Sequence, residues 1–214
     1  MVNLTNSHIE VTDTKSKILA VANELFSKQG FDGVSVRDLA NAADVNVAAI
    51  NYHFKNKLNL YHEIHEYNYD WIAKELTLIS EREDITVSDI AYEMYRLFSE
   101  NGTILINSFK LILSDHLCPD EEMLKNQSKI ESFGPPGGEA LFKVITKEVG
   151  TDVPEEKRDW AMRMMFVTIV YIATLINTRY VKARCMGEAW LEDIEAKELE
   201  IRELANALID RIQK

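Results

Sequence analysis

The segment from Ser35 to Lys57, SVRDLANAADVNVAAINYHFKNK, contains two short amphipathic helical patterns separated by a tight turn. The Ser35 hydroxyl can cap the amides at the start of the first helix, and Asp38, at the third helical position, completes a short capping box. The apolar residues of this helix are spaced i, i+3 and i+4 and predict one buried face: Val36, Leu39 and Ala40.

The first pattern stops near Ala43 and Asp44, and aspartate tolerates the left-handed backbone that a sharp turn between helices needs. Asn46 then caps a second helix, Val47 to Phe54, in which Ile50 and Phe54 share one face. Two short helices joined by a turn of three or four residues are typical of the helix-turn-helix. The second helix of that motif enters a DNA major groove.

The stretch from Thr14 to about Tyr61 holds a series of motifs that follow one another without gaps: Ile18-Leu19-x-x-Ala22-x-x-Leu25-Phe26, Gly30-Phe31-x-x-Val34-Ser35-Val36-Arg37-Asp38-Leu39-Ala40, Ala43-x-Val45, Ala48-Ala49-Ile50-x-Tyr52-His53-Phe54-Lys55-x-Lys57 and Leu60. In these motifs the stretch resembles the DNA-binding domain of the TetR (tetracycline-repressor-type) transcriptional regulators. The match covers roughly a quarter of the chain in detail. It implies a ligand-responsive repressor, not an enzyme, whose second part shares the architecture of the family rather than its motifs.

The net charge of −11 argues against general binding to nucleic acid or anionic membrane, but the charge is unevenly placed. Residues 1–60 hold six of the 24 Lys and Arg residues and six of the 35 Asp and Glu residues, so 18 basic and 29 acidic residues remain in 61–214. Surface charges more than about 10 Å apart are largely screened at ordinary salt. An acidic second part is therefore compatible with DNA contact by the first.

Composition and targeting signals predict a cytoplasmic protein. The two cysteines, Cys118 and Cys185, offer no disulfide framework, which fits a reducing compartment, although a redox-sensing pair is an alternative. The start, MVNLTNSHIE, has neither the basic nor the apolar region of a signal peptide. The apolar run from Met164 to Ile176 is shorter than the roughly 20 residues that span a bilayer and is interpreted as a buried helix.

Helical periodicity continues along the chain, and no alternating strand pattern with a hairpin dipeptide is found. The predicted fold is all-α. A three-helix helix-turn-helix DNA-binding domain, residues 1–57, precedes a helical effector-binding and dimerisation domain, residues 58–214. The helices are expected at about Asp13–Gln29, the two described above, Asn56–Ser80, Thr86–Glu100, Thr103–Ser114, Glu121–Ile130, Glu139–Val149, Pro154–Arg184 and Trp190–Ile212.

DNA binding needs phosphate contacts for position and base-edge contacts for sequence preference. The phosphate candidates are Ser35 and Lys57 at helix starts, and Tyr52 and His53, for which the resemblance implies bonds to the sugar-phosphate backbone; Lys15 and Lys55 are weaker candidates. Tyr52 could instead pack in the core, and Lys57 could be an ordinary surface lysine.

Base reading rests on a few side chains. Val47, Ala48 and Ala49 offer only methyl groups, suited to thymine methyl contact. Asn51 could pair with adenine or reach a phosphate. Arg37 is similar to the family position that reaches a guanine, but a phosphate or a nearby acid would also satisfy it.

The second domain is expected to form a homodimer, because a single helix-turn-helix contacts few bases and such proteins pair on palindromic sites. The predicted interface residues come from the last two long helices: Met164, Val167, Tyr171, Leu191, Ile194, Leu204 and Leu208. The alternative is that these residues only close the core of one chain.

The middle helices are expected to enclose a pocket for an unknown small-molecule effector, with no other cofactor. Candidates are polar and aromatic residues on otherwise apolar helices: His65, Tyr69, Trp71, Tyr92, Tyr95, Asn107, Phe109, Phe142, Tyr171 and Asn177. An effector that prefers the conformer with displaced recognition helices would release DNA by a population shift through the fourth helix.

Other function classes find weaker support. His62 and His65, at i and i+3, suggest a metal, but a zinc site needs further ligands at recognisable spacing. No Gly-rich phosphate loop, nucleophile elbow or HExxH is present. The alternative to a regulator is a helical protein–protein adaptor that keeps the fold without binding DNA, which the apolar start of the recognition helix favours.

Overall fold

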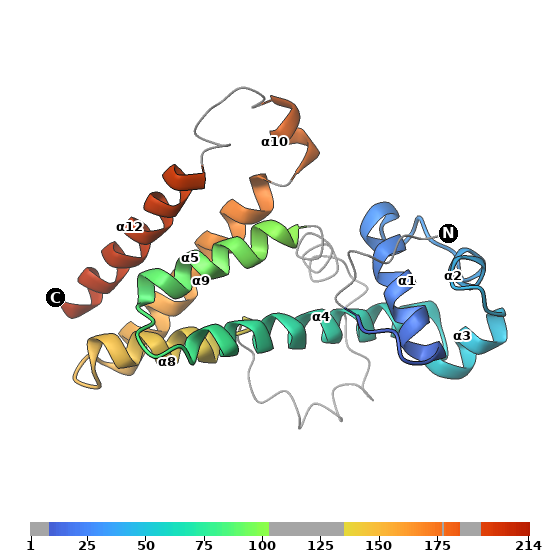
Figure 1. The fold of residues 1–214 in the computed structure, drawn as a ribbon, viewed down its shortest axis with the longest axis horizontal. Helices are drawn as coiled ribbons and strands as arrows, with labels where there is room; N and C mark the ends of the chain where they lie inside the picture. The colour runs from blue at the N-terminus through green and yellow to red at the C-terminus, as the bar shows by residue number, and fades with distance from the viewer. Residues whose placement is uncertain (1–8, 103–134, 177, 185–193) are drawn as a thin grey trace. The chain divides into compact units, whose positions relative to one another are not determined.

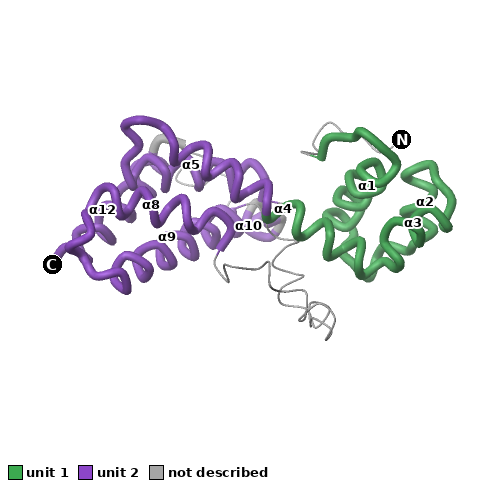
Figure 2. The backbone as a smooth tube through the Cα atoms, turned by 90° about the horizontal axis from the view of Figure 1, so that it is seen from below, with its two compact units in different colours: residues 1–69, 106–124 green, residues 70–105, 125–214 purple. Residues whose placement is uncertain are grey.

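The computed structural model describes residues 9–102, 135–176, 178–184 and 194–214, and within them the protein is all-α (Figure 1). The helices are α1 (Thr14–Gln29), α2 (Val36–Ala42), α3 (Val47–Phe54), α4 (Lys57–Ser80), α5 (Val87–Glu100), α8 (Gly138–Val149), α9 (Glu155–Ile176), α10 (Arg179–Arg184) and α12 (Ile194–Gln213). The described chain divides into two compact units, residues 9–69 and the described residues of 70–105 and 125–214, so that α4 belongs to both (Figure 2).

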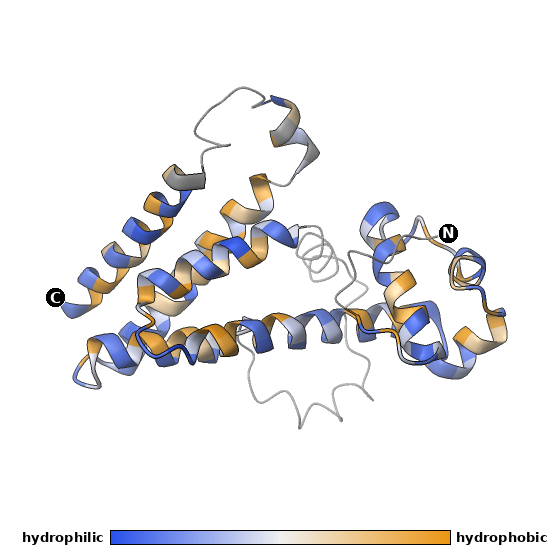
Figure 3. Cartoon of the chain, viewed as in Figure 1, coloured by the Kyte–Doolittle hydropathy of each residue, from blue (hydrophilic) through white to orange (hydrophobic). Residues whose placement is uncertain are grey.

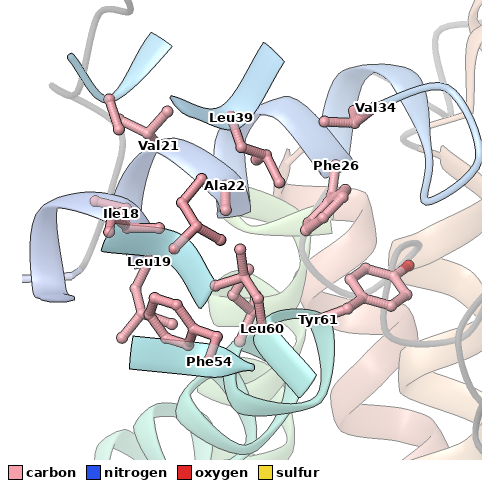
Figure 4. Close-up of a cluster of buried hydrophobic side chains, with 14 of the residues drawn as sticks. Ile18, Leu19, Val21, Ala22, Phe26, Val34, Leu39, Phe54, Leu60 and Tyr61 are labelled. Carbon is pink, nitrogen blue, oxygen red and sulfur yellow. The ribbon is translucent and has the colours of Figure 1, made fainter. Parts of the chain in front are cut away.

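The first unit packs α1, α2, α3 and the start of α4 around one apolar core (Figure 4). The helix α1 supplies most of this core through Ile18, Ala22 and Phe26, each no more than 1% exposed. The Phe26 ring lies 4.8 Å from that of Tyr61 on α4 and 6.0 Å from that of Phe31. These rings join the end of α1, the loop before α2 and α4.

The second unit is a helical cluster in which α9 contacts α5, α8 and α12, and α5 also contacts α8 and α12. Arg202 of α12 ties this cluster together at the start of α5: its Nη1 donates to Asp89 Oδ1 at 2.6 Å and its guanidinium lies over the Tyr92 ring at 5.3 Å. Burial tends to raise the pKa of Asp89, but hydrogen bonds from Thr86 and Arg202 outweigh it, so the pKa is lowered and the carboxylate stays charged.

The helix ends match the sequence pattern where a local cap sets them. Asp13 caps α1 through the amide of Ser16, and Thr86 caps α5 in a complete capping box. Asn56 Oδ1 accepts from the Asn59 amide at 2.8 Å and so caps the start of α4. The predicted helices Thr103–Ser114 and Glu121–Ile130 lie outside the described residues.

The prediction of one helix from Pro154 to Arg184 was wrong, because α9 ends at Ile176 and α10 begins at Arg179. Thr178 accounts for the new start. Its hydroxyl accepts a hydrogen bond from the Val181 amide at 3.2 Å and donates to the Leu175 carbonyl at 2.8 Å. A threonine that bonds both the preceding and the following turn favours a helix boundary over a continuous helix.

The helix α9 is long and apolar enough to cross a membrane by length and composition alone, with 39% of its most apolar window buried in the protein. Its buried face packs against the rest of the second unit through Ala161, Met165 and Ile169. The prediction that the Met164–Ile176 run is buried therefore holds for this face alone, because Met164, Val167 and Tyr171 of the same run are exposed.

Candidate nucleic-acid interface

The helix α2 begins with a complete capping box. The Asp38 amide donates to Ser35 Oγ at 3.2 Å, while the Ser35 amide and hydroxyl donate to Asp38 Oδ2 at 2.9 and 2.6 Å. The hydrogen bonds from Ser35 lower the pKa of the Asp38 carboxyl, so the cap stays intact in mildly acidic solution. The predicted cap is confirmed, and it leaves the side chain of Arg37 exposed.

The turn between α2 and α3 is a Schellman motif. The Val45 amide donates to the Ala40 carbonyl at 3.0 Å and the Asp44 amide to the Asn41 carbonyl at 3.2 Å. Asp44 occupies the left-handed position of this motif, with a φ of 50°. Aspartate therefore adopts here the conformation that glycine usually supplies, as the sequence predicted, and the turn that orients α3 is well defined.

The helix α3 separates a buried face from an exposed one. The Asn46 side chain accepts from the Ala49 amide at 2.7 Å and so begins the helix where the sequence placed it. Ile50 and Phe54 are buried in the core of the first unit. Four of the predicted base-reading residues lie on the other side: Val47, Ala48, Ala49 and Asn51. Ala49 is half-buried, and the other three are exposed.

Tyr52 and His53 form an aromatic pair at the end of α3, with ring centroids 5.1 Å apart in an edge-to-face arrangement. Tyr52 is 84% exposed, so it is not the core residue that the alternative interpretation made it. His53 is half-buried and lies near the start of α1: hydrogen bonds from Ser16 chiefly lower the pKa of Asp13, and His53 adds a smaller contribution. The pair thus leaves the Tyr52 hydroxyl available to a ligand.

Two lysines of the predicted phosphate set already have partners within the protein. Lys57 Nζ donates to the carbonyls of Phe31 and Val34 at 3.0 and 3.1 Å. Lys15 Nζ pairs with the Glu63 carboxylate. Sequence reasoning missed the Lys57 contacts, since its partners lie 23 and 26 residues earlier and no local pattern connects them.

Lys55 joins α3 to α4 in a strained turn. Its φ is 66° and its ψ is −49°, and the Asn56 amide donates to the Phe54 carbonyl at 2.8 Å across it. A bond from residue i+2 to residue i with this geometry is the γ-turn of positive φ, which is rare and strained. The backbone strain therefore lies directly after the recognition helix.

Replacing Lys55 with glycine is expected to raise the free energy of unfolding by about 0.5–1 kcal/mol, because glycine adopts positive φ without a Cβ clash and this gain exceeds its entropic cost. Urea unfolding followed by circular dichroism measures the change. Lys55→Ala is the matched control, since it removes the same charge but keeps the Cβ atom. Equal stability of the two variants would contradict the strain.

One face of α9 carries a row of exposed apolar side chains. Val167 and Tyr171 are 59% and 62% exposed, and Met164 is 38% exposed; Trp160 and Leu175 extend the same row. Of the other predicted interface residues, Leu204 and Leu208 of α12 are half-buried, while Leu191 and the side chain of Ile194 lie outside the described residues. Figure 3 shows the alternation of apolar and polar residues along α12.

The predicted pocket residues are differently placed. Tyr95 is buried, and Tyr92 stacks on it with ring centroids 6.4 Å apart. Phe142 lies under the guanidinium of Arg158 at 5.2 Å. Tyr171 shares the exposed face of α9. Asn107, Phe109 and Asn177 lie outside the described residues.

His65 and Tyr69, also predicted for the pocket, are half-buried on α4 in the first unit, and Trp71 is half-buried on the same helix in the second. Burial and the neighbouring His62 lower the pKa of His65, and its Nδ1 is buried without a hydrogen-bond partner. Among the described residues, no group of three or more His, Cys, Asp or Glu side chains could hold a metal ion.

A surface hollow of about 930 Å³ lies elsewhere, between the start of α9 and the end of α12. None of the residues that line it belongs to the predicted pocket: Glu156, Lys157, Trp160, Ala207, Asp210, Arg211, Ile212 and Lys214. It adjoins the exposed row of α9 through Trp160.

Comparison with known proteins places the helix-turn-helix region in one family. Residues 18–64 match the family model described as bacterial regulatory proteins, tetR family. Over 63 residues the chain is 46% identical to the probable HTH-type transcriptional regulator YttP of Bacillus subtilis (strain 168). These residues cover 29% of this chain and 30% of that protein. Over 57 residues it is 46% identical to the HTH-type transcriptional regulator AcrR of Shigella flexneri, 27% of this chain and 26% of that protein.

The chain thus spans about a third or less of the length of these curated relatives. Solved structures extend the likeness of fold to nearly the whole chain. Salmonella enterica GusR superposes with a TM-score of 0.65 at 16% identity, over 92% of this chain and 95% of that one. PfmR from Thermus thermophilus, a TetR family transcriptional regulator, superposes with a TM-score of 0.59 at 20% identity, over 95% of this chain and 97% of that one.

Proposed function

We propose that this chain, which belongs to the TetR family of bacterial regulatory proteins, is a cytoplasmic repressor of transcription that binds a palindromic DNA operator as a homodimer. The observation that carries the proposal is the outward face of α3. Val47, Ala48, Asn51 and Tyr52 are exposed on a helix whose other face is fixed in the core. A recognition helix needs this separation, because its base-reading residues must be free while its orientation is rigid.

Each predicted DNA-binding residue on α3 and at the starts of α2 and α4 has a chemical task. Arg37 and Asn51 supply hydrogen bonds to base edges, and Val47, Ala48 and Ala49 supply methyl contacts to thymine. The sequence predicts contacts to the sugar-phosphate backbone from Ser35, Tyr52, His53 and Lys57. Because Asp38 engages the amide and hydroxyl donors of Ser35, and two carbonyls engage Lys57, Tyr52 has the most accessible phosphate donor of the four.

The exposed row on α9 supports a homodimer. A soluble protein rarely leaves large apolar side chains aligned on one helix face, and such a row marks an interaction surface. Two copies that join their α9 and α12 helices would cover Met164, Val167 and Tyr171 in a four-helix interface. The two recognition helices would then meet two half-sites of a symmetric operator.

Response to a small molecule is proposed to act through α4, which is one continuous helix from Lys57 to Ser80 and belongs to both compact units. An effector bound by the second unit would favour one position of α4. The equilibrium between DNA-binding and released conformers would shift by the difference in its affinity for them.

The test is selection of genomic fragments by the purified protein at stated salt, beside its Arg37→Ala variant. The wild type is expected to enrich a short two-fold-symmetric sequence. The variant should bind it about 10- to 100-fold more weakly per protomer, since a bidentate contact from arginine to guanine contributes about 1–3 kcal/mol. Relaxed preference at one symmetric pair of positions would identify the bases that Arg37 reads.

Lys28→Ala is the charge-matched control, because Lys28 lies at the end of α1 and pairs with Glu24. It is expected to bind almost as the wild type does. Equal losses in the two variants would assign Arg37 to general electrostatic attraction. Enrichment of nothing by the wild type, even at low salt, would contradict the proposal and favour an adaptor that keeps the fold without binding DNA.

A further inference from the structure

The first turn of α4 is hydrogen-bonded, through Lys57, to the loop that leads into α2. Lys57 Nζ donates to the carbonyls of Phe31 and Val34 at 3.0 and 3.1 Å, and it lies 3.9 Å from the centroid of the Phe31 ring. An ammonium group has three N–H donors, so two of the three are used within the protein. These contacts are charge-assisted and stronger than ordinary hydrogen bonds.

The loop that Lys57 contacts ends directly before the predicted DNA-binding residues of α2. Val34 directly precedes Ser35, the cap of α2, and Arg37 is the second residue of that helix. One turn beyond Lys57, the Tyr61 ring packs on Phe31 with centroids 4.9 Å apart. Two successive turns of α4 therefore hold the segment that sets the position of Arg37.

We propose that Lys57 is a positioning residue, which orients α2 and Arg37 for DNA and makes them follow movement of α4. This inference rests on the proposed function and specifies its relay. Release of operator DNA then needs no change within α3: a shift in the start of α4 pulls on two loop carbonyls and moves Arg37. A lysine bound only to phosphate would have no such link to α2.

The two roles of Lys57 predict different salt dependence. A phosphate contact releases counterions, so losing it from both protomers reduces the slope of log affinity against log salt by about two. Loss of a positioning contact leaves the slope nearly unchanged. Lys57→Met tests this, because it keeps the side-chain stem and removes the ammonium. Phe31→Leu weakens the same clamp without changing charge and serves where Lys57→Met fails to fold.

The decisive measurement is a pair of double-mutant cycles on the selected operator fragment. In a protein that carries Lys57→Met, adding Arg37→Ala is expected to lower operator affinity less than about threefold, because Arg37 is already displaced. Asn51→Ala, on α3, should cost the same in the presence and absence of Lys57→Met. A merely structural role would weaken both contacts alike, and this outcome would overturn the proposal. The proposal would also be overturned if Lys57→Met and Arg37→Ala had additive effects on operator affinity and Lys57→Met lowered the slope of log affinity against log salt by about two.

Amide hydrogen exchange tests the clamp without DNA. In Lys57→Met and Phe31→Leu, the amides of Asp38 and Leu39 are expected to exchange at least about tenfold faster, while those of Ile50 and Phe54 keep their rates. Unchanged exchange at α2 would overturn the inference. If the wild type selects no DNA yet exchange at α2 responds in this way, the proposed function fails and the mechanical link stands.

Discussion

Replacing Phe26 with alanine is expected to lower the free energy of unfolding of the first unit by about 3–5 kcal/mol, because the change removes a buried ring and leaves a cavity. Phe26 is 1% exposed and touches both Phe31 and Tyr61. Its loss would loosen the joint between α1, the loop before α2, and α4. Urea unfolding followed by far-ultraviolet circular dichroism gives the change, and amide exchange of Leu39 and Ile50 assigns it to this unit.

Leu25→Ala is the matched control, since Leu25 is the neighbouring residue of α1 but is only partly buried against the same core. Its smaller buried area predicts a loss of less than about 2 kcal/mol. The operator affinity of folded Phe26→Ala should also fall, since the loop before α2 loses its support. A loss no greater than that of Leu25→Ala would show that the aromatic cluster does not organise the unit.

The helix boundaries of the first unit were predictable because each depends on a local interaction. Ser35 and Asp38 are three residues apart, and their mutual hydrogen bonds need only the start of a helix. Asn46 acts in the same way for α3. Asp44 could be assigned to the left-handed turn because few residues other than glycine tolerate it.

The contacts of Lys57 and the strain at Lys55 could not be predicted in this way. Lys57 meets carbonyls of a loop that only the folded core brings near it. The positive φ of Lys55 opposes the preference of lysine and is imposed by the packing of Phe54 on one side and Leu60 on the other, both buried. In both cases tertiary structure overrides local preference.

In the second unit, apolar periodicity predicted helices but could not tell which apolar side faces the core. Tyr171 was a candidate both for the pocket and for the dimer interface, and its exposed fraction of 62% places it on the surface row of α9. The break at Thr178 was missed because threonine also occurs within helices. A helix that is apolar nearly all round gives no periodic signal for choosing a face.

Replacing Val167 with glutamate is expected to convert the proposed homodimer to a monomer. Val167 is 59% exposed at the middle of the α9 row, so a carboxylate there is solvated in the single chain but must lose its water in an apolar interface. Stability of the single chain should change little for the same reason. Sedimentation velocity measures the association.

Operator affinity should fall about 10²- to 10⁴-fold in Val167→Glu, although the change lies in the second unit, because two linked recognition helices become two independent ones. Binding to an isolated half-site should be unaffected. Leu78→Glu is the matched control, since Leu78 of α4 is 53% exposed and lies on a different helix; the same charge added there should leave the dimer intact. A dimeric Val167→Glu with wild-type affinity for the palindrome would exclude this face of α9 from the interface.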